Sequence, residues 1–160
     1  MLKKTAILGF GNPVRSDDGI GCYVIEQLRQ QFDPCPEWLN LLDMGTSAFE
    51  VLFQLQGHER IILVDAVMNS GEPDGTLFQL PATAAMRAVI DDPMVFLHSL
   101  KWDQALSYAH KILGDQFPAD NIEVYLIAVS DLRLEIGISE PVKAAGDKVC
   151  TLIHSSLLVA

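Results

Sequence analysis

Three side chains that lie far apart in the sequence have the chemistry of a divalent metal site. Asp18 stands at the start of the first predicted helix, Asp65 at the end of the apolar segment 61–66, and His98 in a loop before a later helix. Carboxylate oxygens and an imidazole nitrogen, without a thiolate, suit nickel or zinc. Three ligands leave coordination positions open, so the pattern indicates an ion that is also held by another molecule.

The carboxylates at the start of the first helix argue against a nucleotide site. Gly9 and Gly11 open a segment that is similar to a dinucleotide-binding loop, but Val14 stands where the third glycine belongs. Asp17 and Asp18 would repel a pyrophosphate, whereas the helix dipole favours ionised carboxylates at this position. We expect them to act as charge anchors or cation ligands. The alternative is that they only stabilise the helix.

Other polar side chains give weaker signals. Asp43 ends the second predicted strand, where an Asx-type turn is the simpler interpretation. Cys22 lies near the same edge, but no surrounding signature marks a nucleophile, so we interpret it as a core residue. The remaining histidines are interpreted as surface or satisfied core residues: His58, His110 and His154. The sequence contains neither G-x-S-x-G nor H-E-x-x-H, which argues against a serine hydrolase and an ordinary zinc peptidase.

The elements that must position these residues alternate between strands and helices. Apolar runs predict strands over residues 5–9, 39–43, 61–66, 76–80 and 122–129. Apolar residues that recur at helical spacing predict helices over residues 17–32, 47–56, 102–113 and 139–156. This order predicts a three-layer α/β/α sandwich with a five-stranded, mostly parallel sheet and one antiparallel edge strand, at 76–80. Ligands of such folds collect beyond the carboxyl ends of the strands, where we expect Asp18, Asp65 and His98 to meet.

Length and composition restrict the class of protein. The 160 residues, 49% hydrophobic and 20% charged, predict a single domain over 1–160. With 11 basic and 21 acidic residues the formal charge is −10, which disfavours nucleic acid and anionic membranes as partners and favours a cation or a basic peptide. No apolar run approaches the ~20 residues that span a bilayer. Three cysteines without C-x-x-C spacing fit a reducing compartment, so we expect a cytoplasmic location.

Four segments together are similar to one family. Residues 9–21 match the pattern G-x-G-N-x-x-x-x-D-D-G-x-G, and residues 43–46 resemble D-G-G-T. Residues 61–66 are similar to I-I-x-x-D-A, and residues 98–100 to H-x-L. In this order and spacing the sequence resembles the hydrogenase maturation endopeptidases. These enzymes trim the C-terminus of the nickel-bearing large subunit of nickel-iron hydrogenases.

The resemblance implies a function and a set of site residues. It implies an endopeptidase that removes the C-terminal extension of the large subunit after nickel insertion. Asp18, Asp65 and His98 would be both the metal ligands and the catalytic residues, and they would bind nickel supplied by the substrate. Asp43, Gly45 and Thr46 would help to bind the substrate. No tightly bound cofactor of the chain's own is expected, and the partner would be the nickel-loaded precursor of the large subunit.

The sequence departs from the family pattern at three places. Met44 stands where the family usually has glycine, Lys101 follows the H-x-L segment, and residues 130–133 replace a segment that commonly contains proline. The last two departures are interpreted as marks of the hydrogenase isoform that is served.

Three other hypotheses remain open at this point. The same ligands would serve a non-enzymatic, nickel-dependent docking or checkpoint chaperone that does not cut its partner. A nucleotide-using α/β enzyme is weaker, because of the carboxylates at 17 and 18. An unrelated peptidase or nucleosidase could share the same sandwich.

Overall fold

The chain forms one five-stranded sheet that carries helices on its faces. The computed structural model describes residues 2–46, 54, 57–84, 106, 110 and 113–158. In sheet order β2-β1-β3-β5-β4, the strands are β2 (Leu39–Gly45), β1 (Thr5–Phe10), β3 (Arg60–Met68), β5 (Ile122–Val129) and β4 (Leu77–Pro81). The described helices are α1 (Ile20–Gln31), α6 (Glu140–Leu157) and three short 3-10 helices, η1 (Ser16–Gly19), η2 (Gly114–Gln116) and η3 (Ala119–Asn121).

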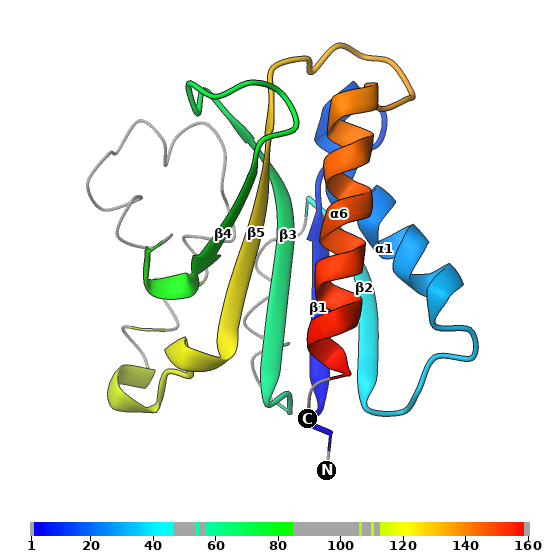
Figure 1. Cartoon of the computed structure of the whole chain (residues 1–160). Helices are drawn as coiled ribbons and strands as arrows, with labels where there is room; N and C mark the ends of the chain where they lie inside the picture. Colours follow the sequence, from blue (N-terminus) through cyan, green and yellow to red (C-terminus); the bar gives the residue numbers. More distant parts are fainter. Residues whose placement is uncertain are drawn as a thin grey trace.

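Four of the strands are parallel, and β4 pairs antiparallel with β5 at one edge, which confirms the predicted sheet. All residues of β1, an interior strand, are buried, because both of its faces are covered. The strands therefore end in the same direction, apart from β4, and their carboxyl ends share one rim (Figure 1). We call this rim the carboxyl edge.

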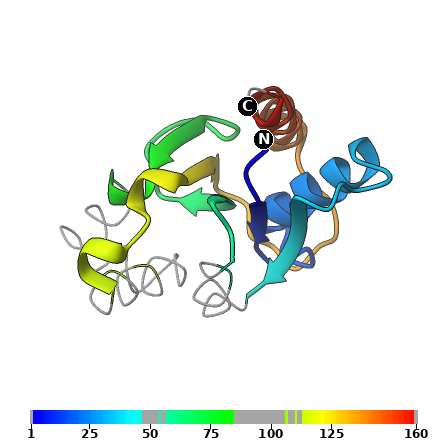
Figure 2. The ribbon, with the colours of Figure 1, turned by 90° about the horizontal axis from the view of Figure 1, so that it is seen from below.

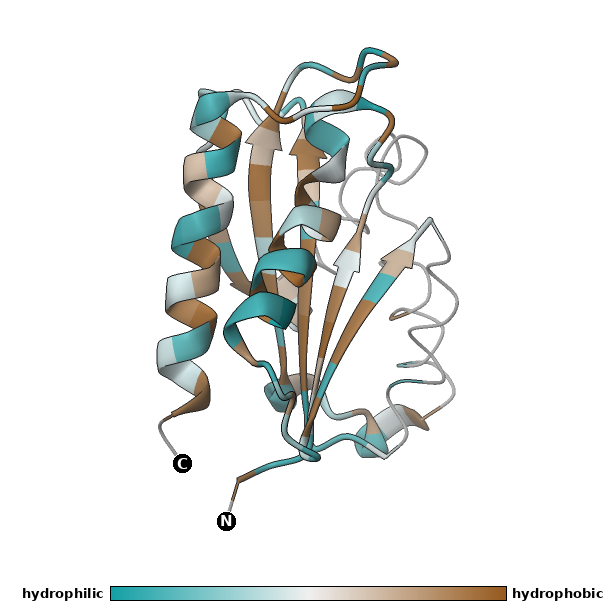
Figure 3. Ribbon diagram, turned by 90° about the vertical axis from the view of Figure 1, so that its right-hand side faces the viewer, coloured by the Kyte–Doolittle hydropathy of each residue, from teal (hydrophilic) through white to brown (hydrophobic). Residues whose placement is uncertain are grey.

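The two long described helices pack on the same face of the sheet (Figures 1 and 2). In α1 the buried residues recur at helical spacing, at Ile20, Val24 and Leu28. Helix α6 begins after Ser139 and buries Val142, Val149 and other residues of one stripe. Figure 3 shows hydrophobic residues along the strands and hydrophilic residues on the outer turns of both helices.

The opposite face of the sheet has its own hydrophobic core. Leu8, Leu63 and Leu126 pack there with Leu106 and Phe117. The core thus has two separate halves with the sheet between them, as the predicted three-layer sandwich requires.

Several predicted boundaries differ from the structure. The third strand continues to Met68, so Asp65 lies inside the strand and not at its end. The first helix starts at Ile20, because residues 16–19 form the 3-10 turn η1 instead. The predicted helices at 47–56 and 102–113 lie mostly outside the described residues. None of the helices in the described part of the chain is long and apolar enough to cross a membrane.

Candidate active site

Glycines bring the first strand and the first helix into direct contact at the carboxyl edge. A Cβ on Gly9 or Gly21 would collide with the backbone across the contact between β1 and the start of α1. A Cβ on Gly11, where φ is +136°, would collide with the carbonyl oxygen of Asp18. The glycines of the 9–21 segment are therefore required for close approach. They fix the backbone that carries Asp18.

Asp18 lies in η1 and is partly exposed. Its Oδ2 accepts a hydrogen bond of 3.0 Å from the backbone N–H of Asn12. This bond links the loop that leaves β1 to the turn that enters α1. It orients the carboxylate without removing it from solvent.

The 43–46 segment forms a turn at the end of β2. Asp43 is exposed, and its Oδ1 accepts a hydrogen bond of 3.0 Å from the Gly45 N–H, which confirms the Asx-type turn. Gly45 has a φ of +54°, and its carbonyl accepts a hydrogen bond from Gly11 N–H. Thr46 follows and is exposed.

Met44 is the extra residue of a β-bulge. Gly9 pairs with Asp43 but Phe10 pairs with Gly45, so Met44 has no partner on β1. Its partly buried side chain packs against the core on the face opposite α1. The positive φ falls on Gly45, so a side chain at position 44 is compatible with this turn.

Asp65 is one of the few buried charged residues among those described, with 7% of its surface exposed. Its Oδ1 accepts a hydrogen bond of 2.8 Å from the N–H of Ala66. Leu63 and Val67 pack with the core opposite α1, and alternation along β3 places Asp65 on that same face. Asp43 follows Leu41, which belongs to the core beneath α1. The two carboxylates therefore reach the carboxyl edge from opposite faces of the sheet.

The thiol of Cys22 contacts one of these carboxylates. Its Sγ donates to Oδ1 of Asp43 at 3.2 Å, and the carbonyl of Gly11 lies at 3.6 Å. Burial raises the pKa of Cys22 to about 12, with further contributions from the Asp43 hydrogen bond and from the charges of Asp43, Asp18 and Asp65. Asp43 thus contacts the sulfur atom, whereas Asp18 and Asp65 contribute through their charge alone.

Our interpretation of Cys22 as a plain core residue was therefore incomplete. It is partly exposed and contacts a residue of the candidate site. Its position directly after Gly21, at the end of the 9–21 segment, is the signal that the sequence offers. The high pKa keeps the thiol protonated near neutral pH, which argues against a nucleophilic role.

His98 lies outside the described residues. The residues that the structure does describe contain no group of three or more His, Cys, Asp or Glu side chains placed to hold a metal ion. The three-residue metal site therefore stays a prediction. Of the acidic residues at the carboxyl edge, Asp43 contacts Cys22, and the charges of Asp18 and Asp65 also raise the pKa of that thiol.

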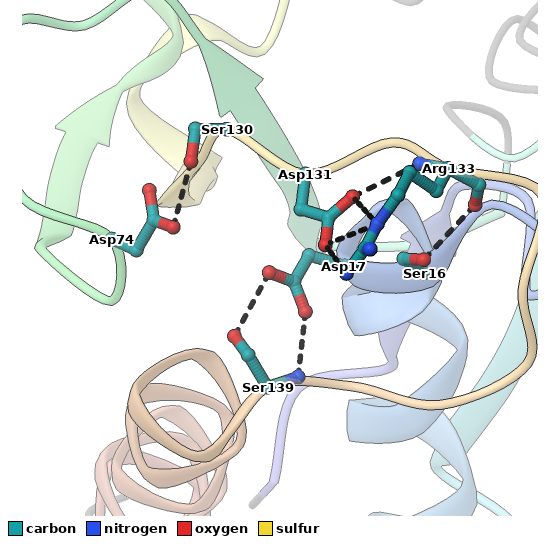
Figure 4. A network of polar contacts seen from close by, with 7 residues as sticks. All are labelled: Ser16, Asp17, Asp74, Ser130, Asp131, Arg133 and Ser139. Atoms are coloured by element: carbon teal, nitrogen blue, oxygen red, sulfur yellow. Dashed lines mark hydrogen bonds and ion pairs between the residues drawn. The ribbon is translucent and has the colours of Figure 1, made fainter.

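Asp17 has a different role from its neighbour. It is 1% exposed, and its carboxylate accepts hydrogen bonds from the N–H and the hydroxyl of Ser139, at 2.7 and 2.9 Å (Figure 4). Ser139 immediately precedes α6. Asp17 thus anchors the start of α6 to the start of α1, as expected of a charge anchor.

The remaining histidines are far from this edge or lie on the surface. His58 bonds to Asn40 and to the carbonyl of Gln54, near the opposite end of β2. His154 stacks at 4.9 Å from Phe32. His110 is exposed. Their interpretation as surface or satisfied residues is confirmed, and the three cysteines are free.

Comparison with known proteins identifies the family. The family model described as hydrogenase maturation protease matches residues 22–156. The chain belongs to the hydrogenase maturation protease family. This match covers most of the chain, and it includes Asp43 and Asp65 of the carboxyl edge.

Individual relatives carry related names. The hydrogenase 2 maturation protease of Escherichia coli is 31% identical over 46% of this chain and 44% of its own length. The hydrogenase expression/formation protein HoxM of Cupriavidus necator is 29% identical over 80% of this chain and 59% of its own length. The alignments thus span about half the length of these two relatives. The coenzyme F420 hydrogenase subunit delta of Methanothermobacter thermautotrophicus is 28% identical over 96% and 94% of the two chains.

Solved structures of the family share this fold. The hydrogenase maturating endopeptidase HybD of Escherichia coli superposes with a TM-score of 0.74, covering 96% of this chain and 91% of its own, at 22% identity. At that identity the likeness concerns the fold.

Proposed function

We propose that this family member is an endopeptidase that removes the C-terminal extension of a nickel-iron hydrogenase large subunit after nickel insertion. The observation that carries the proposal is the match of residues 22–156 to the hydrogenase maturation protease family model. Family membership supplies the reaction class, and the carboxyl edge, where Asp18 and Asp43 lie, supplies a location for it. The names of the relatives, which refer to hydrogenase maturation or formation, support the same substrate.

In this proposal the substrate brings the metal. Asp18 and Asp65 supply carboxylate oxygens at the carboxyl edge, and His98 supplies the imidazole predicted from the sequence. Nickel held by the precursor would gain these ligands and bring the scissile peptide bond beside them. A metal ion polarises a carbonyl oxygen or a bound water, which is the chemistry that peptide hydrolysis needs. Recognition would therefore depend on loaded nickel, and the chain would need no resident cofactor.

The substrate and the location of the reaction follow from the same argument. Asp43 and the turn at Gly45 and Thr46 would contact the precursor next to the cut. The formal charge of −10 disfavours nucleic acid and anionic membranes as partners. Because the proposed substrate is a precursor in the course of maturation, we place the reaction in the cytoplasm.

The decisive experiment compares nickel-loaded with nickel-free precursor. Each is incubated with the purified chain, and the intact mass of the large subunit is measured. We expect a loss of mass, with a matching released peptide, only from the nickel-loaded form. No change in mass with either form would overturn the endopeptidase proposal. Equal cleavage of both forms would overturn the nickel dependence.

A second candidate function is a docking or checkpoint chaperone that binds the loaded precursor without cutting it. It is favoured by one relative that aligns over nearly its full length and is named as a hydrogenase subunit. The same incubation separates the two functions. A chaperone would form a nickel-dependent complex, visible by size-exclusion chromatography, while the mass of the precursor stayed unchanged.

A further inference from the structure

The segment that joins β5 to α6, residues 130–139, is hydrogen-bonded to neighbouring segments at both ends and in its middle. We call this segment the strap. The Ser130 hydroxyl donates to Asp74 at 2.8 Å, and Ser139 bonds to Asp17 at the other end (Figure 4). Between them, the Ser16 hydroxyl donates to the Arg133 carbonyl at 2.9 Å.

Backbone pairing holds the middle of the strap as well. The N–H of Ser16 donates to the carbonyl of Glu135 at 2.8 Å, and the N–H of Glu135 donates to the carbonyl of Val14 at 3.0 Å. This forms an isolated parallel bridge between Arg15 and Glu135. The strap is thus a fixed part of the surface.

This fixed segment presents large apolar side chains to solvent. Leu134 is 81% exposed and Ile136 is 83% exposed, and Val14 beside them is 47% exposed. Of the six exposed large hydrophobic residues among those described, two lie on the strap and Val14 lies on the segment that pairs with it. Apolar side chains that gather on a fixed part of the surface mark an interaction site.

A groove of about 550 Å³ runs from the strap to the carboxyl edge. The strap forms one wall with residues 136–138, and α1 forms another with Cys22, Tyr23 and Glu26. Asp43 also lines the groove, so the groove reaches the candidate active site. A chain lying in it would pass from Ile136 to the carboxylates.

The charges in this groove select its occupant. Three carboxylates line it, at Glu26, Asp43 and Glu140, against one ammonium group, at Lys143. A lysine or arginine side chain would complement the excess negative charge, and the apolar strap would bind apolar side chains. The occupant with the best complementarity is an extended segment that carries both.

We propose that the strap and this groove dock a segment of the large-subunit precursor in which apolar side chains neighbour a lysine or arginine. The inference rests on the proposed function for the identity of the partner. It goes further by naming a surface outside the metal ligands that provides affinity. Ile136 and Leu134 hold the segment, and Glu26 and Glu140 bind its basic side chain.

The test removes the apolar contact and keeps the fold. The double variant Leu134→Ser/Ile136→Ser changes only side chains that are exposed in the structure. Leu158→Ser is the matched control, because Leu158 is 67% exposed and follows α6, whose end lies opposite the strap (Figure 1). Binding of the nickel-loaded precursor and the steady-state constants for its cleavage are measured for each.

We expect the double variant to raise Kd and KM at least about tenfold, as loss of central apolar anchors does, and to leave kcat unchanged. Leu158→Ser should match the wild-type protein. The pair Glu26→Gln/Glu140→Gln should weaken binding less and reduce its dependence on salt, because it removes a charge attraction.

The outcomes also separate this inference from the proposed function. If the double variant binds and is as active as the control, the docking surface is wrong while cleavage by the wild-type protein still supports the proposed function. If wild-type protein binds the precursor without shortening it, the endopeptidase proposal fails, and weaker binding by the double variant still supports the docking surface. If the wild-type protein does not bind the precursor at all, the docking surface is wrong.

Discussion

Two aspartates that are neighbours in the sequence lie in two contrasting regions of the molecule. Asp17 is buried at the junction of η1, the strap and α6, where both of its oxygens accept hydrogen bonds from Ser139. Asp18 is partly exposed at the carboxyl edge, where Oδ2 accepts a bond from Asn12 and the charge acts on Cys22. One carboxylate holds elements together, and the other faces the place where a substrate would arrive.

The difference shows that adjacent residues of one short motif can have different roles, one in the stability of the fold and one in its chemistry. A buried carboxylate needs hydrogen bonds to offset its desolvation, and Asp17 obtains them from a helix start. The desolvation cost of Asp18 is smaller, because its carboxylate keeps its contact with solvent. A carboxylate that stays in contact with solvent can bind a cation. The first region should therefore control stability, and the second should control activity.

The largest effect should come from the carboxyl edge. Asp18→Asn and Asp65→Asn each remove a proposed nickel ligand while preserving side-chain shape. We expect kcat/KM for the nickel-loaded precursor to fall about 10³-fold, the size of effect seen when a group that stabilises the transition state is lost. Such a fall corresponds to about 4 kcal/mol. Intact-mass assays of the precursor over time measure it.

The control for this prediction is Asp17→Asn. The amide oxygen can still accept from the Ser139 N–H, and the amide N–H₂ can donate to the Ser139 hydroxyl, so the junction should survive. Its kcat/KM should stay within about threefold of wild type, less than half the 1.4 kcal/mol of a tenfold change. Equal losses for Asp17→Asn and Asp18→Asn would remove the functional distinction between the two regions.

The next largest effect should come from the buried junction. Asp17→Ala removes two hydrogen bonds to a charged acceptor and leaves the Ser139 N–H without that acceptor at the start of α6. We expect the free energy of unfolding to fall by about 3 kcal/mol, since each bond to a charged group contributes about 1.5–3 kcal/mol. Urea denaturation measures it.

Ser139→Ala provides the comparison within this junction. It removes only the hydroxyl bond and keeps the backbone N–H bond to Asp17. The free energy of unfolding should fall by about 1.5 kcal/mol, half the effect of Asp17→Ala, because one of the two bonds to the carboxylate is removed. If Asp17→Ala were no more destabilising than Ser139→Ala, the junction would not depend on the buried carboxylate.

The sequence predicts the strands that form the carboxyl edge well, because the signals for strands are local. The strand at 122–129 and the antiparallel edge position of the 76–80 strand are confirmed. Continuous apolar runs and turn residues specify these elements without long-range information. Family membership is also confirmed, from motifs that are each only a few residues long.

The sequence does not reveal which of two adjacent aspartates is buried. That depends on Ser139, which lies 122 positions away and meets Asp17 only once both helices are packed. The same holds for Asp65, which we placed at the end of a strand that in fact continues to Met68. The bulge at Met44 depends on pairing with β1, so a pattern within β2 alone cannot show it.

A smaller effect should reveal the electrostatic coupling at the carboxyl edge. The pKa of Cys22 is raised to about 12 by burial and then by Asp43, and removal of a negative charge favours the thiolate. Asp43→Asn should therefore speed alkylation of Cys22 by iodoacetamide at pH 8, by about tenfold for each unit by which the pKa falls. Mass spectrometry of the peptide that contains Cys22 measures the rate.

Cys35 is the internal control for this experiment. It is exposed, and Asp43 is not among its hydrogen-bond partners in the described structure, so its alkylation rate should not change. Asp18→Asn and Asp65→Asn should accelerate Cys22 less than Asp43→Asn, because their charges contribute less. An unchanged Cys22 rate in all three variants would show that the carboxylates do not act at a common place.

The smallest effect should come from the exposed side of the strap. Arg133 donates hydrogen bonds to Asp131 and holds the pKa of that carboxyl below its usual value, but the Arg133 side chain is 75% exposed. A carboxyl whose pKa is lowered by folding stabilises the native state above its usual pKa and loses this contribution as the pH falls through the lowered value. Asp131→Asn should lower the unfolding midpoint slightly at pH 7.

That difference should disappear in acid, when the wild-type carboxyl is protonated as well, and it should shrink in high salt. Thermal unfolding at pH 7 and at pH 2, with and without added salt, measures both effects. A loss of stability at pH 7 as large as that caused by Asp17→Ala would mean that exposed and buried carboxylates stabilise the strap equally. Burial would then not explain why Asp17, and not Asp131, anchors α6.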